Sequence, residues 1–199
     1  MHLFFSTPVW ITEINNFENI NKELINYIYN AKKKNPEGKT KSNVYGWHSE
    51  DFDLKDQELK NFISEISKNI GIAIKEMNWD LDSQIVKITS MWSIINNKDA
   101  FNERHHHGSS ALSAAYYVKA EKNAGNIIFF DPRQANVFHH PISKEVNNIN
   151  AQVQSVTPRA GTLVLFPSYL EHKVDPNLSN KERIVISFNV SLLRKKDLI

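Results

Sequence analysis

The second half of the chain is a series of short strand-like segments, and this pattern constrains the fold more than any other feature. From Gln84 onward the sequence changes to a period of two, which is typical of a strand whose side chains point to opposite faces. Further strand-like segments follow at residues 111–118, 126–130, 151–157, 161–166 and 183–192. Many short strands separated by turns, placed after two helices, predict a mainly β sandwich or jelly roll.

The first half of the chain predicts supporting helices. A strand-like segment at residues 3–14 is interrupted by Pro8, which restricts it to a sheet edge or splits it. Apolar residues at helical spacing predict helices at residues 20–33 and 56–77, and Gly71 costs the second about 1 kcal/mol relative to alanine. A short strand is expected at residues 44–48. We expect both helices to pack on the sheet, and we assign them no chemistry.

Length and composition restrict the class of protein. We expect one domain over residues 1–199, in which residues 1–80 support a core barrel at residues 84–192. The net charge of +2 gives no global basic field for nucleic acid, and the absence of cysteine excludes disulfides and thiolate ligands. No apolar run approaches the roughly 20 residues of a membrane span, and no secretory signal is recognisable. A cytoplasmic protein with no membrane or nucleic-acid partner is therefore expected.

A cluster of histidines is the main candidate for chemistry. His105 and His107 lie two positions apart, so on an extended strand both point to one face while His106 points to the other. His172 is the natural third ligand, because it lies between two apolar strand-like runs. Imidazole suits iron, zinc, copper and nickel, and three protein ligands leave positions open for substrate and oxygen. The competing interpretation is a solvated histidine loop and a separate histidine in the core.

Five motifs, taken in order, carry a family resemblance. They are HxH at residues 105–107, YYV at 116–118, GN followed by an apolar strand and DPR at 125–133, GTLVLFPSYLEH at 161–172, and RIVISFN at 183–189. Together they resemble the double-stranded β-helix oxygenases, which use Fe(II) and 2-oxoglutarate. The chain is more closely similar to a 2OG-Fe(II) oxygenase family of marine bacteria and cyanophages, whose members open with a segment like LFFSTPVW at residues 3–10.

The resemblance covers nearly the whole chain and is densest at residues 102–133 and 161–189. It implies a cupin-like jelly roll, the double-stranded β-helix, with about two N-terminal helices packed on the sheet. It also implies a cytosolic location, in a bacterium or a phage-infected host.

Site residues follow from the resemblance, position by position. It implies that His105 and His172 bind iron and that Arg183 pairs with the distal carboxylate of 2-oxoglutarate. Arginine suits this role because its planar fork meets a carboxylate with two parallel hydrogen bonds. Ser187 lies on the same strand face and can donate a further hydrogen bond, and Tyr117 matches a tyrosine that contacts this carboxylate in prolyl hydroxylases.

The middle ligand departs from the family pattern. The superfamily usually has HxD or HxE, whereas this chain has His107 at that position. Either the site uses His105, His107 and His172, or a carboxylate such as Asp131 or Glu103 reaches in; three histidines are favoured. Smaller departures are Gly108 and Ala114, where close relatives are expected to have proline and glycine.

The expected activity is that of a 2-oxoglutarate-dependent dioxygenase. It would use molecular oxygen to hydroxylate a C–H bond of an unidentified small molecule or protein side chain, with release of succinate and CO2. Trp92, Asn102, Asn189 and the polar segment 134–150 are candidates for the substrate-side wall. A homodimer formed through edge strands is also expected to be accessible.

Two other functions remain open at this point. The first is a cupin-like metal dioxygenase or isomerase with a three-histidine site, which would not use 2-oxoglutarate and would give Arg183 no special role. The second is a non-catalytic jelly-roll module that binds a partner. Loss of His105 or His172 would leave partner binding intact in such a module.

Overall fold

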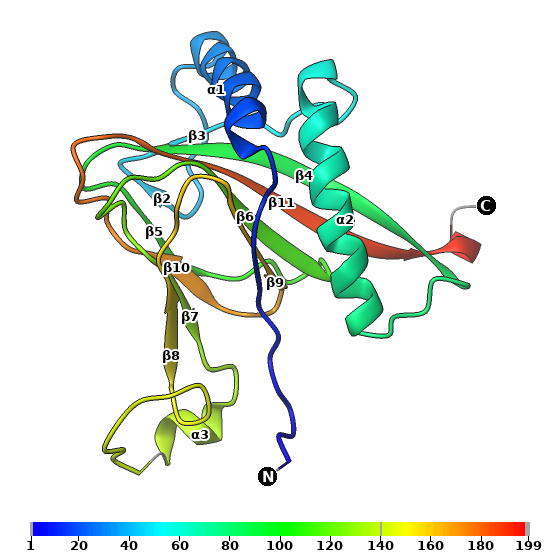
Figure 1. The fold of residues 1–199 in the computed structure, drawn as a ribbon, viewed down its shortest axis with the longest axis vertical. Helices are drawn as coiled ribbons and strands as arrows, with labels where there is room; N and C mark the ends of the chain where they lie inside the picture. The colour runs from blue at the N-terminus through cyan, green and yellow to red at the C-terminus, as the bar shows by residue number, and fades with distance from the viewer. Residues whose placement is uncertain (1, 140, 198–199) are drawn as a thin grey trace.

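The computed structural model describes residues 2–139 and 141–197, which form two antiparallel sheets and two long helices (Figure 1). The six-stranded sheet contains, in spatial order, β1 (Trp10–Glu13), β9 (Thr162–Pro167), β6 (Leu112–Lys119), β11 (Arg183–Arg194), β4 (Gln84–Asn96) and β3 (Trp47–His48). The five-stranded sheet contains β2 (Asn43–Val44), β5 (Phe101–His105), β10 (His172–Val174), β7 (Ile127–Phe130) and β8 (Val153–Val156). The predicted jelly-roll sandwich is confirmed.

The helices are α1 (Phe17–Lys34), α2 (Lys60–Glu76) and the short α3 (Gln134–Phe138), with single 3-10 turns at Gln57–Leu59 and Lys195–Asp197. Figure 1 shows α1 and α2 on the same side of the six-stranded sheet. No helix in the described ranges has the length and apolar character that crossing a membrane requires.

The central strands β9, β6 and β11 are largely buried on both faces of the six-stranded sheet. Successive residues of a strand point to opposite sides, so each strand contributes to two cores. On β6, Tyr116 belongs to the core under the helices, whereas Tyr117 belongs to the core between the two sheets. On β11, Ile184 and Ile186 face the helices and Val185 faces the other sheet. Double burial explains why these strands read as nearly continuous apolar runs.

Helix α1 is attached to the sheet by apolar packing and by a buried polar contact. Ile20, Leu24 and Ile28 form its buried stripe, at the spacing seen in the sequence. On the same face, the Asn21 side chain donates a 2.9 Å hydrogen bond to the Val118 carbonyl. Its Oδ1 accepts one of 2.7 Å from the Tyr116 hydroxyl. These contacts fix α1 against β6.

Several elements differ from the sequence prediction. Only Trp10–Glu13 of the segment 3–14 forms a strand, which pairs with β9. Residues 101–105, which were not among the predicted strands, form β5, and His172 begins the short strand β10. Both strands are polar or very short, so they lack the apolar alternation that marks β4. The polar segment 134–150 contains α3.

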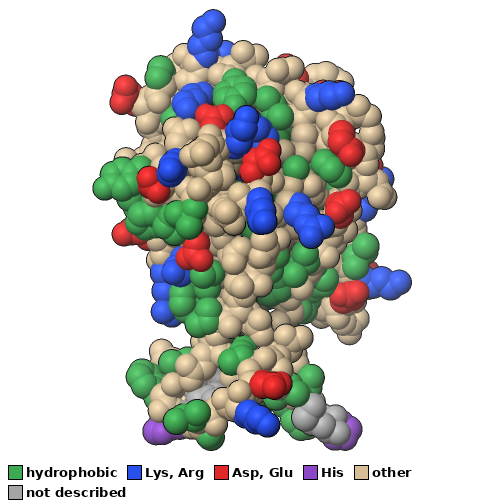
Figure 2. Space-filling model, turned by 60° about the vertical axis from the view of Figure 1, so that its left-hand side comes forward, with side chains coloured by type: hydrophobic (Ala, Val, Ile, Leu, Met, Phe, Trp, Pro, Cys, Tyr) green, Lys and Arg blue, Asp and Glu red, His purple; other side chains and the backbone are tan. Residues whose placement is uncertain are grey.

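One lobe extends away from the body of the sandwich. Figure 1 shows that it consists of the far ends of β7 and β8 with α3 between them, and Figure 2 shows it below a narrower waist. Apolar side chains lie on its surface, among them Phe138, Ile142 and Val146, which are 78%, 104% and 73% exposed. The lobe lies apart from the cavity described next.

Candidate metal centre

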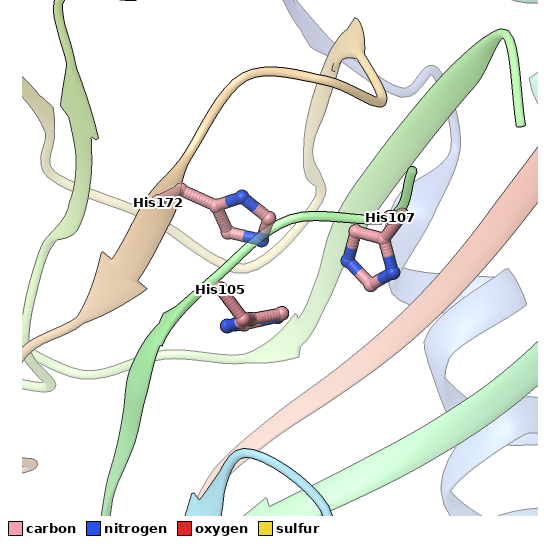
Figure 3. A group of neighbouring side chains, drawn as sticks. All are labelled: His105, His107 and His172. Atoms are coloured by element: carbon pink, nitrogen blue, oxygen red, sulfur yellow. The ribbon is translucent and has the colours of Figure 1, made fainter. Parts of the chain in front are cut away.

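Three imidazoles meet at one end of the five-stranded sheet. His105 ends β5, His107 follows two residues later, and His172 opens β10 directly opposite His105 in the antiparallel register. Figure 3 shows the three rings gathered around one point. One potential ligand atom from each ring lies within 4.8 Å of the others. Across residues 2–139 and 141–197 no second group of three or more such side chains has this geometry.

The tautomers of two rings are fixed by backbone carbonyls. His105 Nδ1 lies 2.7 Å from the Glu103 carbonyl, and His172 Nδ1 lies 3.0 Å from the Leu170 carbonyl. A carbonyl only accepts, so each Nδ1 carries the proton and Nε2 keeps its lone pair for a metal. The loop that carries His107 is fixed differently, because its backbone N–H donates a 2.9 Å hydrogen bond to the Ser168 carbonyl.

All three rings are uncharged at neutral pH. Burial, together with the neighbouring imidazoles, lowers the pKa of His172 to about 3 and that of His107 to about 4. Burial also lowers the pKa of His105. Metal binding needs the neutral imidazole, so no proton has to be removed before a cation binds.

Neither carboxylate considered from the sequence lies in this cluster. Asp131 accepts hydrogen bonds of 3.0 and 2.8 Å from the Arg133 guanidinium, and Glu103 is exposed on β5. Neither residue lines the cavity that contains the histidines. The donors brought together are therefore three neutral imidazoles, a set that suits Fe(II) and leaves coordination positions open.

The histidines open into a cavity of about 450 Å³ between the sheets. Its walls include residues from both sheets and from the segment 39–51. Arg183, Tyr117 and Ser187 line the same cavity, so the structure brings the proposed cosubstrate residues and the histidines together. This size is within the range of small-molecule sites.

Arg183 carries an unpaired charge into this cavity. It is 1% exposed, and its Nη1 donates to the carbonyls of Asp175, at 2.9 Å, and of Ala124. Its Nη2 is buried and has no hydrogen-bond partner. Burial lowers the pKa of Arg183, while Tyr117 and Asp175 oppose that shift. A buried guanidinium with a free N–H group fits a carboxylate ligand.

A glycine makes room for this guanidinium. Gly125 has a φ of +86°, and a Cβ there would lie 2.5 Å from Arg183 Nη1. The turn between β6 and β7 therefore brings its backbone close enough for the Ala124 carbonyl to accept from Arg183.

Tyr117 and Ser187 lie on adjacent strands. Tyr117 pairs with Val185 and Ser187 pairs with Ala115 across β6 and β11. Burial raises the pKa of Tyr117 to about 12, so its hydroxyl stays protonated and able to donate.

Only some of the candidates for the substrate-side wall line the cavity. Trp92 and Asn102 line the cavity, although the Asn102 amide also contacts Asn96 and Ser42, each at 3.3 Å. Asn189 does not line the cavity, and its side chain forms hydrogen bonds with Ser113 and Ser90. The described residues of the segment 134–150 lie in the outer lobe, away from the cavity.

A segment that no sequence motif marked closes the other side of the cavity. Lys39, Lys41, His48, Ser49 and Asp51 line it. The only sequence signal was the short strand expected at residues 44–48, which carried no motif.

Comparisons with known proteins agree with this geometry. The profile of a family described as "Putative 2OG-Fe(II) oxygenase" matches residues 90–189. No curated protein matches the sequence. A prolyl-4-hydroxylase from Pseudomonas putida has a similar structure at 14% identity, with a TM-score of 0.63 over 96% of this chain and 94% of that one. None of these comparisons supports a cyanophage source.

Two further structures share the fold. HygX from Streptomyces hygroscopicus, with nickel, 2-oxoglutarate and hygromycin B bound, is 10% identical with a TM-score of 0.65, over 93% of this chain and 83% of that one. The viral collagen prolyl hydroxylase vCPH from Paramecium Bursaria Chlorella virus-1 is 15% identical with a TM-score of 0.56, over 91% and 95% of the two chains. At these identities the likeness shows the fold alone.

Proposed function

Because the chain belongs to the 2OG-Fe(II) oxygenase family, we propose that it hydroxylates a C–H bond of a substrate still to be identified. The reaction consumes molecular oxygen and releases succinate and CO2. The enzyme is a 2-oxoglutarate-dependent dioxygenase whose cofactors are Fe(II) and 2-oxoglutarate. The observation that carries the proposal is one cavity that holds both the histidine cluster and the free Nη2 of Arg183.

In this proposal His105, His107 and His172 hold the iron. The backbone carbonyls bound to Nδ1 of His105 and His172 would leave Nε2 of each ring as the atom that binds the metal. Bound Fe(II) supplies the activation of oxygen that drives hydroxylation. The neutral third ligand leaves the site one charge unit more positive than a site with a carboxylate, which favours binding of the dianionic cosubstrate.

In this proposal Arg183 receives the distal carboxylate of 2-oxoglutarate through Nη2, and the hydroxyls of Tyr117 and Ser187, which line the same cavity, donate to it. Apolar side chains such as Phe166 and Val185 complete this part of the cavity and keep water from competing for these donors. The alternative three-histidine enzyme without 2-oxoglutarate would leave the buried Nη2 of Arg183 without a ligand, so the observation favours the cosubstrate.

An anaerobic titration tests the proposal. Protein loaded with Fe(II) is titrated with 2-oxoglutarate, and the visible charge-transfer band of the chelate is recorded. We expect the band in wild type, its loss in His105→Ala and His172→Ala, and its loss or marked weakening in Arg183→Ala. The matched control is Arg194→Ala, an exposed arginine at the other end of the same strand.

Iron binding without any band in wild type would contradict the proposal. Where the band forms, release of succinate in the presence of candidate compounds identifies the substrate, and its product gains one oxygen atom.

A further inference from the structure

The cavity wall contributed by β3 and β4 contains two stacked rings that the proposed chemistry does not use. His48 and Trp92 both line the cavity, and their ring centroids lie 5.7 Å apart at an interplanar angle of 11°. Pairing of β3 with β4 places His48 opposite Ile94. The Trp92 ring also lies 5.8 Å from that of His107, so the pair borders the histidine cluster.

His48 presents a hydrogen-bond acceptor. It is 8% exposed, and its Nδ1 lies 2.7 Å from the Ser49 carbonyl. Nδ1 must therefore donate, which leaves the lone pair on Nε2. Burial lowers the pKa of His48, so the ring stays neutral and keeps that lone pair at neutral pH. Within the described part of the chain, Nε2 makes no hydrogen bond.

Trp92 presents a hydrogen-bond donor. Its Nε1 is buried and has no partner, and an indole N–H can only donate. An unpaired buried donor is unfavourable until a ligand supplies an acceptor. Two other indoles have partners within the protein: Trp10 donates to Glu76 at 2.6 Å, and Trp47 donates to the Asn35 carbonyl at 2.9 Å.

The charges at the rim of the cavity balance. Lys39 forms an ion pair with Glu50, and Lys41 and Asp51 line the cavity with opposite charges. This part of the rim therefore has no net charge to select an ionic substrate group over a neutral one.

We propose that His48 and Trp92 form the primary-substrate subsite and that it binds an amide. The amide carbonyl accepts from Trp92 Nε1, and the amide N–H donates to His48 Nε2. An amide supplies both groups on neighbouring positions and is neutral, whereas a ketone or a carboxylate supplies acceptors only. This inference rests on the proposed function, since it assigns the remaining wall of the same site.

Indole NMR signals test the subsite directly. The probes are acetamide, acetone and acetate, and the protein is 15N-labelled and loaded with 2-oxoglutarate and Zn(II), a diamagnetic substitute for iron. The Trp92 Nε1–H signal is identified by its absence in Trp92→Phe. We expect acetamide to shift this signal and to bind roughly two- to tenfold more tightly than acetone or acetate, the effect of one additional hydrogen bond.

Variants separate the two hydrogen bonds. His48→Phe keeps an aromatic ring but loses the acceptor, so acetamide should bind only as tightly as acetone, while acetone itself is unaffected. His48→Gln restores a side-chain acceptor and should recover part of the difference. The matched control is Trp79→Phe, because Trp79 lies in the groove between α2 and β4 and outside the cavity.

Two results would overturn the subsite: equal binding of acetamide and acetone in wild type, or an unchanged preference in His48→Phe. If His48→Phe does not fold, His48→Leu is measured in its place. The comparison of acetamide with acetone in wild type tests the subsite without any variant. N-methylacetamide then distinguishes the source of the amide. Binding as tight as that of acetamide indicates a peptide bond, and much weaker binding indicates a primary carboxamide.

The charge-transfer band keeps this inference distinct from the proposed function. His48→Phe and Trp92→Phe should retain the band with Fe(II) and 2-oxoglutarate, because neither residue contacts Arg183 in this scheme. No band in wild type contradicts the oxygenase site itself, whereas a normal band without any preference for acetamide contradicts the subsite alone.

Discussion

At the scale of single residues, the position of the Arg183 guanidinium depends on the space left by Gly125. A Cβ at position 125 would meet the Asp175 carbonyl and Arg183 Nη1, and the φ of +86° is strained for any other residue. We expect Gly125→Ala to displace the guanidinium and to weaken 2-oxoglutarate binding by about tenfold, with a destabilisation of about 1–3 kcal/mol. Titration of the charge-transfer band and urea unfolding measure the two effects. An unchanged affinity for 2-oxoglutarate would contradict this prediction.

The buried histidines make the metal-free protein sensitive to acid. Burial lowers the pKa of His172 to about 3 and that of His107 to about 4. The same rings take up protons near pH 6.5 in the unfolded chain. Below about pH 6.5 the unfolded state therefore binds more protons than the folded state, and the free energy of unfolding decreases as the pH falls toward the folded values.

We expect the urea midpoint of metal-free protein to be lower at about pH 5 than at about pH 7.5, and the difference to be smaller in His172→Asn. His139→Asn, which replaces an exposed histidine of the outer lobe, is the control and should keep the wild-type difference. A urea midpoint that is higher at the lower pH would contradict this prediction.

The sequence contained the histidine cluster in a recognisable form but not the wall opposite it. Spacing of two places His105 and His107 on one side of a chain, and His172 followed a strong apolar strand. His48 could not be found in this way, because its position depends on two residues of β3 pairing with a distant part of β4. A contact of that kind leaves no period or motif in the sequence.

At the scale of secondary-structure elements, Gly71 lowers the stability of α2, and a substitution can restore it. Gly71 lies on the exposed side of the helix, and a Cβ there would have nothing within 4 Å. We expect Gly71→Ala to stabilise the protein by about 0.5–1 kcal/mol, because alanine restricts the unfolded chain and favours the helix. Urea unfolding measures the gain, and 2-oxoglutarate affinity should not change. Destabilisation would indicate a contact at position 71 that this structure does not contain.

The hydrogen bond between Tyr116 and Asn21 contributes to the attachment of α1 to β6. Tyr116→Phe would remove the hydroxyl that donates to Asn21 Oδ1 and leave this buried oxygen without its partner. We expect a destabilisation of about 1–3 kcal/mol by urea unfolding. Tyr29→Phe, which removes an exposed hydroxyl bonded to Glu182, is the control and should cost much less. Equal effects of the two substitutions would contradict a special role for the buried contact.

The sequence predicted some of the strands correctly and did not predict others. The buried strands β4, β6, β9 and β11 were predicted because burial on one or both faces imposes apolar residues. β5 and β10 were not, since β5 is mostly polar and β10 has only three residues. Both carry metal-site histidines, so the elements that were hardest to predict are those that bring His105 and His172 together.

At the scale of the whole molecule, ligands should stabilise the fold by mass action. A ligand at a hundred times its Kd adds about 2.7 kcal/mol, which corresponds to a rise of roughly 5–11 °C in Tm for a domain of this size. We expect Zn(II) to raise the Tm and 2-oxoglutarate to raise it further. Arg183→Ala should keep the first increase and lose most of the second. Two unchanged increases in this variant would contradict the assignment of Arg183.

Alternate residues of β11 line the cavity or pack under the helices, and this alternation determines which mutations the protein can tolerate. Arg183, Val185 and Ser187 line the cavity, whereas Ile184, Ile186 and Phe188 pack beneath the helices. Substitutions in either set can therefore accumulate with little effect on the other. Loss of a single residue within β11 cannot be tolerated in the same way, because it would exchange the two sets and bury Arg183 among isoleucines. Changes of length should be confined to the loops, while changes of specificity can arise along the strand itself.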